Sequence, residues 1–294
     1  MLAESKLDFV SLNANKKFAE RKYWGEKTIT IENINPLQDY DCSNLKRAND
    51  EYHVDVPREI YAALEKIAAN YKAKHIILLA GLSILIQRYG SVSGACIFTP
   101  AYQDIQISGS QNAIVPVMSG GFSEFNFKQY VNHIKEDFVH GVRHSNYPVH
   151  YMLGLEKQQL ADTGVIGCVV NGLQQLSSFD ELQVDLLFSF FNSGAQTLTV
   201  TYNNGKFSRG YIQRLAHAYF SFLKTLMDNP EQLIGKIGLG GLLSSDAERH
   251  LLLETYNATA AFYPEDQTIV DLFEAQVLRS PDHIALECEG QEVS

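Results

Sequence analysis

The stretch Val165–Asn171, VIGCVVN, decides how the fold of this chain is assigned. Apart from one glycine and the closing asparagine it is wholly apolar, and the β-branched residues valine and isoleucine dominate it. Such residues favour strands. Because apolar and polar residues do not alternate, the run predicts a central strand with both faces covered.

Shorter strands are expected on both sides of this run. HVDVP at 53–57 alternates apolar and polar residues, and ACIFTP at 95–100 is apolar up to its closing proline. VDLLFSFF and TLTVTYN alternate around NSGAQ at 192–196, which predicts an antiparallel hairpin. An antiparallel pair together with helices indicates an α/β two-layer sandwich that extends to about residue 230.

Several amphipathic or apolar helices complete this expectation. Apolar residues with helical spacing predict them, as do a proline at one start and a glycine at one end. The expected helices are one ending near Trp24, one from Pro57 with Ile60, Leu64, Ile67 and Tyr71 on one face, one at 73–89, one capped by Ser123 with Phe127, Ile134 and Phe138 inward, and one at 208–228 with Ile212, Leu215, Tyr219, Leu223 and Leu226 inward.

Composition excludes several classes of function. The net charge is -10 and the pI is about 5.4, so the phosphates of a nucleic acid would be repelled. The start of the sequence lacks a signal-peptide pattern, and the most apolar segment, His75–Leu85, is too short to span a bilayer. We therefore expect a cytoplasmic protein that binds neither nucleic acid nor membrane.

The cysteines and histidines do not compose a recognisable site. Cys42, Cys96, Cys168 and Cys288 lie far apart without a CxxC pair, and we expect buried free thiols. His133 and Asp137 form an HxxxD spacing, but inside an amphipathic helix, where a histidine usually lies on the surface. His140 and His144 have the spacing of a metal pair without a third ligand. The sequence thus predicts no metal site and no complete active site.

The order of these segments resembles the condensation domains of nonribosomal peptide synthetases. FAERKYWGE, which carries Trp24, is similar to the helix that precedes the second lobe of that family. The run 74–103 is similar to the family's helix–turn–strand segment, with Phe98 where a glycine is usual. The resemblance implies a fold like one lobe of chloramphenicol acetyltransferase.

Three short segments supply the site residues that the resemblance implies. SQNAIVPV at 110–117 stands where the family has an FVNT motif; Asn112 matches it, whereas alanine replaces the threonine and the usual arginine is absent. HSNYPV at 144–149 matches an HxxxPF-type segment, and VVNGLQ at 169–174 matches a strand with an asparagine. The implied substrate-tunnel or carrier-docking residues are Asn112, His144, Asn146, Tyr147, Pro148 and Asn171.

The end of the sequence resembles the passage from a condensation domain into an adenylation domain. A helix at 268–278 and a strand at 284–288 are similar to the first elements of an adenylation domain. The expected organisation is an N-terminal segment at 1–50, the condensation-domain second lobe at 51–230, a linker at 231–260 and the start of an adenylation domain at 261–294.

The family's catalytic signature, HHxxxDG on the first lobe, does not occur in these 294 residues. In the family its second histidine acts on the acceptor amine, so the resemblance implies no catalytic residue here. It also implies no covalently bound cofactor in this chain. The phosphopantetheine arms would come from partner carrier domains, and the other implied partners are the first lobe or another synthetase subunit and the downstream adenylation domain.

Three functions stay open at this point. The lobe could complete a condensation site in trans, serve as a degenerate platform or docking element that heads a starter module, or act as an independent acyltransferase. A lone second lobe would expose apolar surface and a strand edge. We therefore expect this surface to be covered by another part of a protein. The cover would be the first lobe, a second copy of the chain in a homodimer, or residues 1–50 folded back onto the lobe.

Overall fold

The computed structural model divides the chain into two compact units, residues 1–245 and residues 246–294. The structure describes residues 17–28, 36–39, 48–101, 114–153, 164–170, 179, 182–191, 195–237, 250, 254–255, 257–260, 267–281, 283–284, 286–288 and 291–293.

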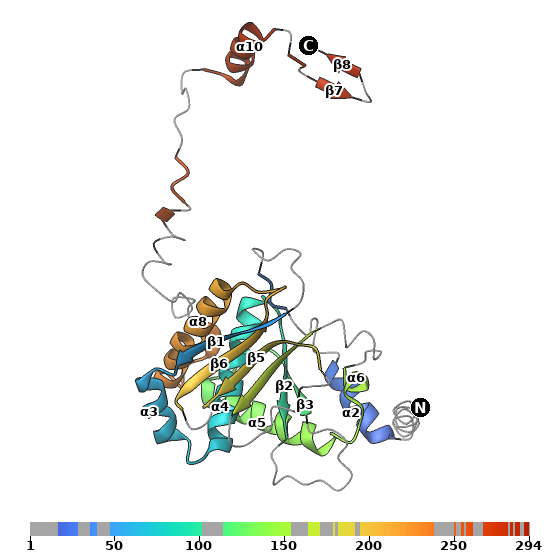
Figure 1. The fold of residues 1–294 in the computed structure, drawn as a ribbon, viewed down its shortest axis with the longest axis vertical. Helices are drawn as coiled ribbons and strands as arrows, with labels where there is room; N and C mark the ends of the chain where they lie inside the picture. Colours follow the sequence, from blue (N-terminus) through green and yellow to red (C-terminus); the bar gives the residue numbers. More distant parts are fainter. Residues whose placement is uncertain are drawn as a thin grey trace. The chain divides into compact units, whose positions relative to one another are not determined.

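A mixed six-stranded sheet, in the order β1-β6-β5-β4-β2-β3, forms the centre of the first unit (Figure 1). β4 pairs in parallel with both β5 and β2, and the other neighbours are antiparallel. The predicted central strand and the predicted hairpin, β5–β6, are both confirmed. The strands are β1 (Asn49–Asp55), β2 (Ala95–Pro100), β3 (Ile114–Ser119), β4 (Val165–Val170), β5 (Val184–Phe190) and β6 (Thr197–Asn203).

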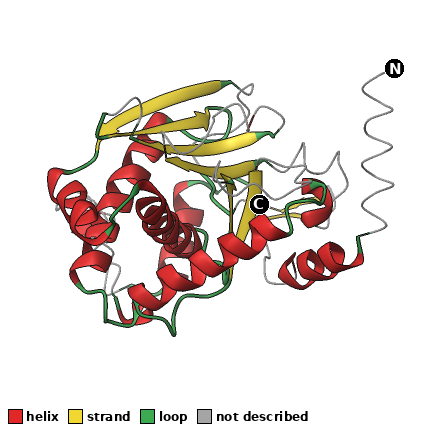
Figure 2. Ribbon diagram, turned by 90° about the horizontal axis from the view of Figure 1, so that it is seen from below, coloured by secondary structure: helices red, strands yellow, loops and turns green. Residues whose placement is uncertain are grey.

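A layer of helices covers one face of this sheet, as Figure 2 shows. They are α3 (Arg58–Ile67), α4 (Tyr71–Tyr89), α5 (Phe127–Arg143) and α8 (Arg209–Asp228). The sheet and this helical layer confirm the predicted α/β two-layer sandwich. Two further helices, α2 (Phe18–Thr28) and α6 (Val149–Met152), lie against each other beside β2 and β3.

Helix α4 lies at the centre of the helical layer, and every residue from Lys74 to Gln87 is buried. It contacts α5, α8, β2 and β4. A Cβ added at Gly81 would lie 2.9 Å from the Leu223 Cδ1 of α8. The Tyr219 hydroxyl of α8 donates a 2.9 Å hydrogen bond to the Leu78 carbonyl oxygen. The absence of a side chain at Gly81 therefore permits the close approach of the two helices.

Both faces of β4 are buried, as its sequence predicts. Ile166 and Cys168 join the core beneath the helical layer, whereas Val165 and Val169 join a second cluster on the opposite face. Successive strand residues point to opposite faces, so the alternation between clusters follows from strand geometry. Trp24 belongs to the second cluster. Among the described residues, part of the cover thus comes from the first 50 residues.

Side-chain caps precede α4, α5 and α8, and one of them corrects the prediction. α5 begins after Asn126, whose side chain accepts from the Gln129 backbone N–H while the Gln129 side chain accepts from the Asn126 N–H. This capping box replaces the predicted cap at Ser123, which lies too early to reach the first turn. Ser208 caps α8, as the prediction placed it.

The apolar face predicted to run from Ile60 to Tyr71 is wrong in its second half. Ile60 and Leu64 are buried, but Ile67 is 57% exposed and Tyr71 is 43% exposed. The helix ends at Ile67, and extended backbone at Ala68 separates it from α4. Helical periodicity cannot continue across that break to Tyr71, which begins α4, and Ile67 is the exposed last residue of α3.

Strand β3 is absent from the prediction, because Pro116 lies at its centre. A proline cannot donate to a sheet ladder, and in sheets it is found mainly on edge strands. β3 forms one edge of the sheet and pairs only with β2, with Pro116 opposite Phe98. The position of the strand at the edge explains why a proline is tolerated there.

The cysteines differ from one another in burial. Cys96 and Cys168 are buried free thiols, as predicted, and burial raises the pKa of Cys96 to about 12. Cys288 is exposed, which corrects the expectation for that residue. Cys42 lies outside the described residues. The two buried thiols therefore stay protonated and act as small apolar side chains.

The chain that follows α8 packs back onto the first unit through residue 237. Ile234 and Ile237 are buried, and Ile234 lies in the short 3₁₀ helix η3 (Ile234–Lys236). The Ile234 N–H donates to the Phe125 carbonyl oxygen at 2.9 Å. The Arg88 side chain donates to the Ile234 carbonyl oxygen at 2.7 Å. We call residues 229–237 the exit strap.

The second unit contains helix α10 (Ile269–Arg279) and a two-stranded sheet of β7 (Leu286–Cys288) and β8 (Gln291–Val293). Thr268 and Asp271 form a capping box at the start of α10, so the predicted helix begins as expected. The observed strand is shorter than the predicted 284–288 segment. Large apolar side chains of this unit are exposed, including Ile269, Phe273 and Leu278.

None of the helices in the described part of the chain combines the length and the apolar character that crossing a bilayer requires.

The close approach at Gly81 predicts a large effect of adding a branched side chain. Gly81→Val is expected to lower the free energy of unfolding by about 1–3 kcal/mol, because the buried Leu223 side chain leaves no free volume. Urea denaturation measures this difference. Gly25→Val in α2 is the matched control, since nothing lies within 4 Å of its added Cβ. Equal stability of the two variants would contradict the packing that we describe.

Buried His75 predicts an acid-sensitive fold. Burial lowers its pKa to about 3, and its Nε2 lies 2.9 Å from the Thr99 hydroxyl. The unfolded pKa is about 6.5. Because the folded pKa is lower, this stabilisation is complete above pH 6.5 and is lost as the pH falls from 6.5 toward 3. Through this residue, each unit by which the pH falls within this window should lower the free energy of unfolding by up to about 1.4 kcal/mol.

The histidine responsible can be identified by comparing two substitutions. His75→Gln should flatten the pH dependence of urea denaturation between pH 7 and 4, whereas exposed His217→Gln should leave it unchanged. A wild-type slope in His75→Gln would assign the acid sensitivity to other groups.

Candidate functional site

Four of the residues implied by the family resemblance lie in one turn. His144, Asn146, Tyr147 and Pro148 follow the last residue of α5 and precede α6. We call residues 144–148 the 144–148 turn. Asn112 and Asn171, the other two predicted site residues, lie outside the described residues.

The 144–148 turn starts from the end of α5 and leaves two polar side chains partly exposed. The His144 N–H donates to the His140 carbonyl oxygen at 3.1 Å, which closes the last helical turn. Tyr147 and Pro148 are buried, whereas His144 and Asn146 are half-buried. Proline disfavours helical backbone in the residue before it, so α5 cannot continue through Tyr147. The buried side chains of Tyr147 and Pro148 therefore anchor the turn in the first unit.

Helix α2 holds the backbone of this turn from a distant part of the chain. The Lys17 Nζ, just before the helix, donates to the Asn146 carbonyl oxygen at 2.9 Å. The indole N–H of Trp24 donates to the His144 carbonyl oxygen at 3.0 Å. The Tyr23 ring stacks on the His144 ring, with centroids 4.3 Å apart and planes 17° apart. Two backbone carbonyls and one side chain are thus fixed by a single helix.

Partial burial also sets the charge of the turn. Burial lowers the pKa of His144, and the carboxylate of Glu20 opposes that shift. The imidazole is therefore neutral near pH 7. Burial raises the pKa of Tyr147, so its phenol stays protonated. The turn consequently presents neutral polar groups rather than a charge.

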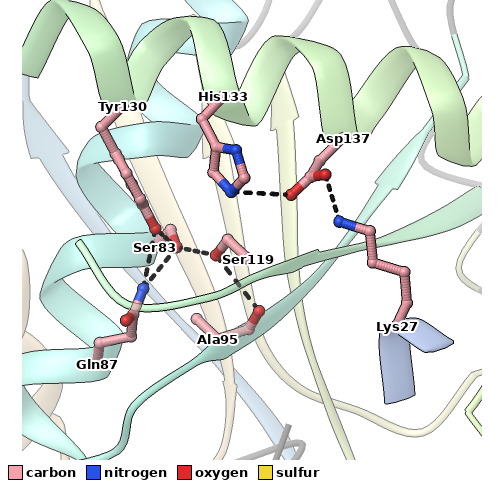
Figure 3. Close-up of polar contacts among 8 residues, drawn as sticks. All are labelled: Lys27, Ser83, Gln87, Ala95, Ser119, Tyr130, His133 and Asp137. Atoms are coloured by element: carbon pink, nitrogen blue, oxygen red, sulfur yellow. Dashed lines mark hydrogen bonds and ion pairs between the residues drawn. The ribbon is translucent and has the colours of Figure 1, made fainter. Parts of the chain in front are cut away.

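A second polar cluster, drawn in Figure 3, lies inside the first unit between α4, α5 and β3. The Ser83 hydroxyl lies 2.6 Å from the Ser119 hydroxyl and 2.9 Å from the Tyr130 hydroxyl. The Gln87 side-chain amide donates to the Tyr130 hydroxyl at 2.9 Å. All four side chains are buried, and burial raises the pKa of Tyr130. This network joins elements that would otherwise meet only through apolar contact.

The HxxxD pair lies next to this network on α5 (Figure 3). His133 Nε2 is 3.4 Å from Asp137 Oδ2, and the other oxygen of Asp137 is paired with the Lys27 ammonium of α2. The His133 ring stacks on Phe125 with centroids 5.3 Å apart. Both side chains are thus engaged in packing and in an ion pair that ties α2 to α5, which suits a structural role.

A buried carboxylate that the sequence analysis does not identify lies at the start of β5. Asp185 is 0% exposed and accepts from Asn203 at 3.0 Å and from Lys206 at 2.6 Å. Gly164 has φ +66, and an added Cβ there would lie 2.0 Å from the Asp185 carboxylate. The charge is paired and hydrogen-bonded, as a buried charge must be. These contacts join the start of β5 to the end of β6 and to Lys206.

Sequence signals for these clusters are weak. Ser83 and Gln87 are polar residues four apart on an otherwise apolar helix, so they share one face and indicate a buried polar partner. Nothing in the sequence designates Tyr130 or Ser119 as that partner. Among the described residues, no group of three or more histidine, cysteine, aspartate or glutamate side chains could hold a metal ion. The expectation of no metal stays a prediction.

Curated proteins with similar sequences are large peptide synthetases. Tyrocidine synthase 2 of Brevibacillus parabrevis is 25% identical over 279 residues, which cover 84% of this chain and 8% of that protein. Bacitracin synthase 1 of Bacillus licheniformis is 24% identical over 267 residues, covering 81% of this chain and 5% of that protein. The chain thus spans less than a tenth of the length of these relatives. No protein-family model matches it.

Solved structures with the same fold include condensation domains. A four-domain nonribosomal peptide synthetase bound to AMP and glycine aligns with a TM-score of 0.64 at 13% identity, covering 94% of this chain and 24% of that one. The starter condensation domain of rhizomide synthetase aligns with a TM-score of 0.57 at 12% identity, covering 81% and 58%. The X-domain from teicoplanin biosynthesis has a TM-score of 0.55 at 15% identity, covering 81% and 60%.

The sequence is similar to parts of peptide synthetases, and the fold is that of condensation domains. The resemblance read from the sequence motifs is confirmed, and so is the fold that it implied.

The buried polar network predicts a measurable loss of stability. Tyr130→Phe removes the hydroxyl that accepts from Gln87 and leaves that buried amide with the weaker 3.2 Å contact to Ser83. The expected loss is about 1–3 kcal/mol in the free energy of unfolding, the cost of an unpaired buried polar group. Chemical denaturation measures it. Tyr71→Phe, at a 43% exposed tyrosine, is the matched control and should change stability little. Equal effects would contradict the network.

Proposed function

We propose that residues 51–230 act as the second lobe of a condensation site, which joins two carrier-bound substrates through an amide bond. A first lobe that carries the HHxxxDG signature would supply the catalytic histidine. Support comes from the condensation-domain fold and from relatives that are peptide synthetases. The substrates would arrive on the phosphopantetheine arms of carrier domains, and an adenylation domain would follow in the same synthetase.

The observation that carries this proposal is the 144–148 turn. It resembles the family's HxxxPF-type segment, and we infer that it helps to shape the acceptor side of the tunnel. Its backbone is fixed by two hydrogen bonds from outside the turn, and yet the His144 side chain stays partly exposed. A fixed backbone with accessible polar side chains is the arrangement that a pre-formed binding surface requires.

The lobe is not expected to catalyse by itself. The 294 residues lack HHxxxDG. His75 is fully buried, so it is not placed to take a proton from a substrate. The chemistry of proton handling would reside on the first lobe, and this lobe would contribute binding and orientation.

A second function, a non-catalytic platform, is supported by a different observation. Phe98 stands where the family usually has a glycine, and it is 0% exposed within the cluster that also contains Trp24. A phenyl ring there occupies volume that a glycine would leave open. If the tunnel of the family passes this face, the ring would narrow it. The lobe would then dock partners, including a second copy of itself, without supporting condensation.

Reconstitution in trans separates the two functions. The chain is mixed with a separate first lobe that carries HHxxxDG and with donor-loaded and acceptor-loaded carrier domains, and dipeptide is measured by mass spectrometry. We expect no dipeptide from the chain alone and product in the full mixture. Replacement of the second signature histidine by alanine in the added lobe should abolish the product.

The other outcomes are equally informative. One outcome is that the chain binds carriers without forming dipeptide and that Phe98→Gly restores dipeptide formation. This result would support the tunnel and show that the Phe98 ring blocks it. Carrier binding without dipeptide in both forms would favour the platform. Dipeptide from the chain alone would overturn the two-lobe proposal.

A further inference from the structure

Helix α2 docks on the lobe through very few side chains. Among residues 17–27 only Trp24 is buried, at 1% exposure, while Phe18 at the start of the helix is 79% exposed. A Cβ added at Gly141 of α5 would lie 3.5 Å from the Trp24 ring, so the indole lies directly over that glycine. A helix without an apolar stripe gains little from area burial, and its position must depend on specific contacts.

Those contacts extend along the whole helix. Lys17 binds the turn at one end, Trp24 binds it from the middle of the helix, and Lys27 pairs with Asp137 of α5 near the other end, as Figure 3 shows for the last pair. The Lys17 and Trp24 donors both meet backbone carbonyls. Bonds to the backbone constrain the path of the turn and leave the chemistry of its side chains free.

The turn has an unsatisfied polar atom, which shows that its own contacts do not determine its conformation fully. The amide oxygen of Asn146 is buried and has no hydrogen-bond partner among the described residues. Leaving such an atom unpaired opposes the observed conformation. The Lys17 and Trp24 donors are contacts from outside the turn that hold its backbone in this conformation.

We propose that Lys17 and Trp24 are positioning residues, which hold the 144–148 turn in the conformation that a carrier-bound arm meets. The second half of this inference, that the turn binds a carrier-bound arm, rests on the proposed function. The first half, that α2 fixes the turn, stands on the hydrogen bonds alone. Neither residue needs to touch the substrate for its loss to weaken binding.

The test measures local order and carrier binding in the full chain. Trp24→Phe keeps an aromatic ring and removes the N–H donor, and Lys17→Met keeps the length of the side chain and removes the ammonium. Lys22→Met, on an exposed position of the same helix, is the matched control. Hydrogen–deuterium exchange is followed in peptides from residues 144–153 and, as an internal reference, from α4.

Both variants should accelerate exchange about 3- to 10-fold in 144–153, the factor expected for one lost hydrogen bond, without a change in α4. Affinity for a carrier domain loaded with phosphopantetheine should fall by a similar factor. The control should match the wild type in both measurements. If exchange in 144–153 is unchanged in both variants, the positioning role is overturned.

The two halves of the inference fail differently. Faster exchange with unchanged carrier affinity would retain the positioning of the turn and overturn its link to docking. A wild-type chain that binds no carrier at all would overturn the proposed function, and the exchange data alone would then decide whether α2 positions the turn. Global unfolding of Trp24→Phe would show as faster exchange in α4, in which case Lys17→Met decides.

Discussion

Helix α4 is buried on every side, and the rest of the first unit is arranged around the need to cover it. Its residues from Lys74 to Gln87 are buried against α5 and α8 in the helical layer and against β2 and β4 in the sheet. A helix that is apolar all round is stable only inside a larger body. The two-layer architecture satisfies this constraint, because the sheet covers one side and neighbouring helices cover the others.

The polar residues of α4 show how strongly this burial constrains the sequence. Ser83 and Gln87 meet the Tyr130 hydroxyl, His75 meets Thr99, and the Lys74 ammonium lies 2.5 Å from Glu65. Each of these four side chains therefore makes at least one polar contact to another element: α5, β2 or α3. Apolar contacts alone allow helices to slide past one another, whereas these polar contacts require one relative position of the elements that they join. The network thus specifies how α3, α4, α5 and β2 are mutually aligned.

The sequence predicts the parts of the fold that depend on local pattern. The unbroken apolar run at 165–170 predicts a central strand, and the alternation at 184–203 predicts the hairpin, because these patterns depend only on which face is buried. β3 escapes prediction, since Pro116 is acceptable only at an edge, and edges are determined by topology. The docking of α2 is not predicted either, because Trp24 and His144 are 120 positions apart in the sequence and no local pattern encodes their contact.

The same distinction applies to the candidate site. Motif similarity identifies His144 and Asn146, but the contacts that hold their turn come from Lys17 and Trp24, which carry no motif of their own. α5 connects this turn to the exit strap: its first residues contact the strap, and its last residue leads into the turn. With 17 residues the helix is about 25 Å long. A rigid element of that length fixes the distance between the turn and the point where the chain leaves the lobe.

Arg88 fixes the point where the chain leaves the lobe. Its guanidinium lies between the Phe122 and Phe222 rings, 5.3 Å and 4.9 Å from their centroids, while it donates to the Ile234 carbonyl oxygen at 2.7 Å. A cation stacked on two aromatic faces is held more firmly than one in water, because part of its hydration is replaced by the rings. Burial lowers the pKa of Arg88, but a guanidinium keeps its charge in proteins. The path of the chain out of the lobe is therefore set by the core itself through residue 237.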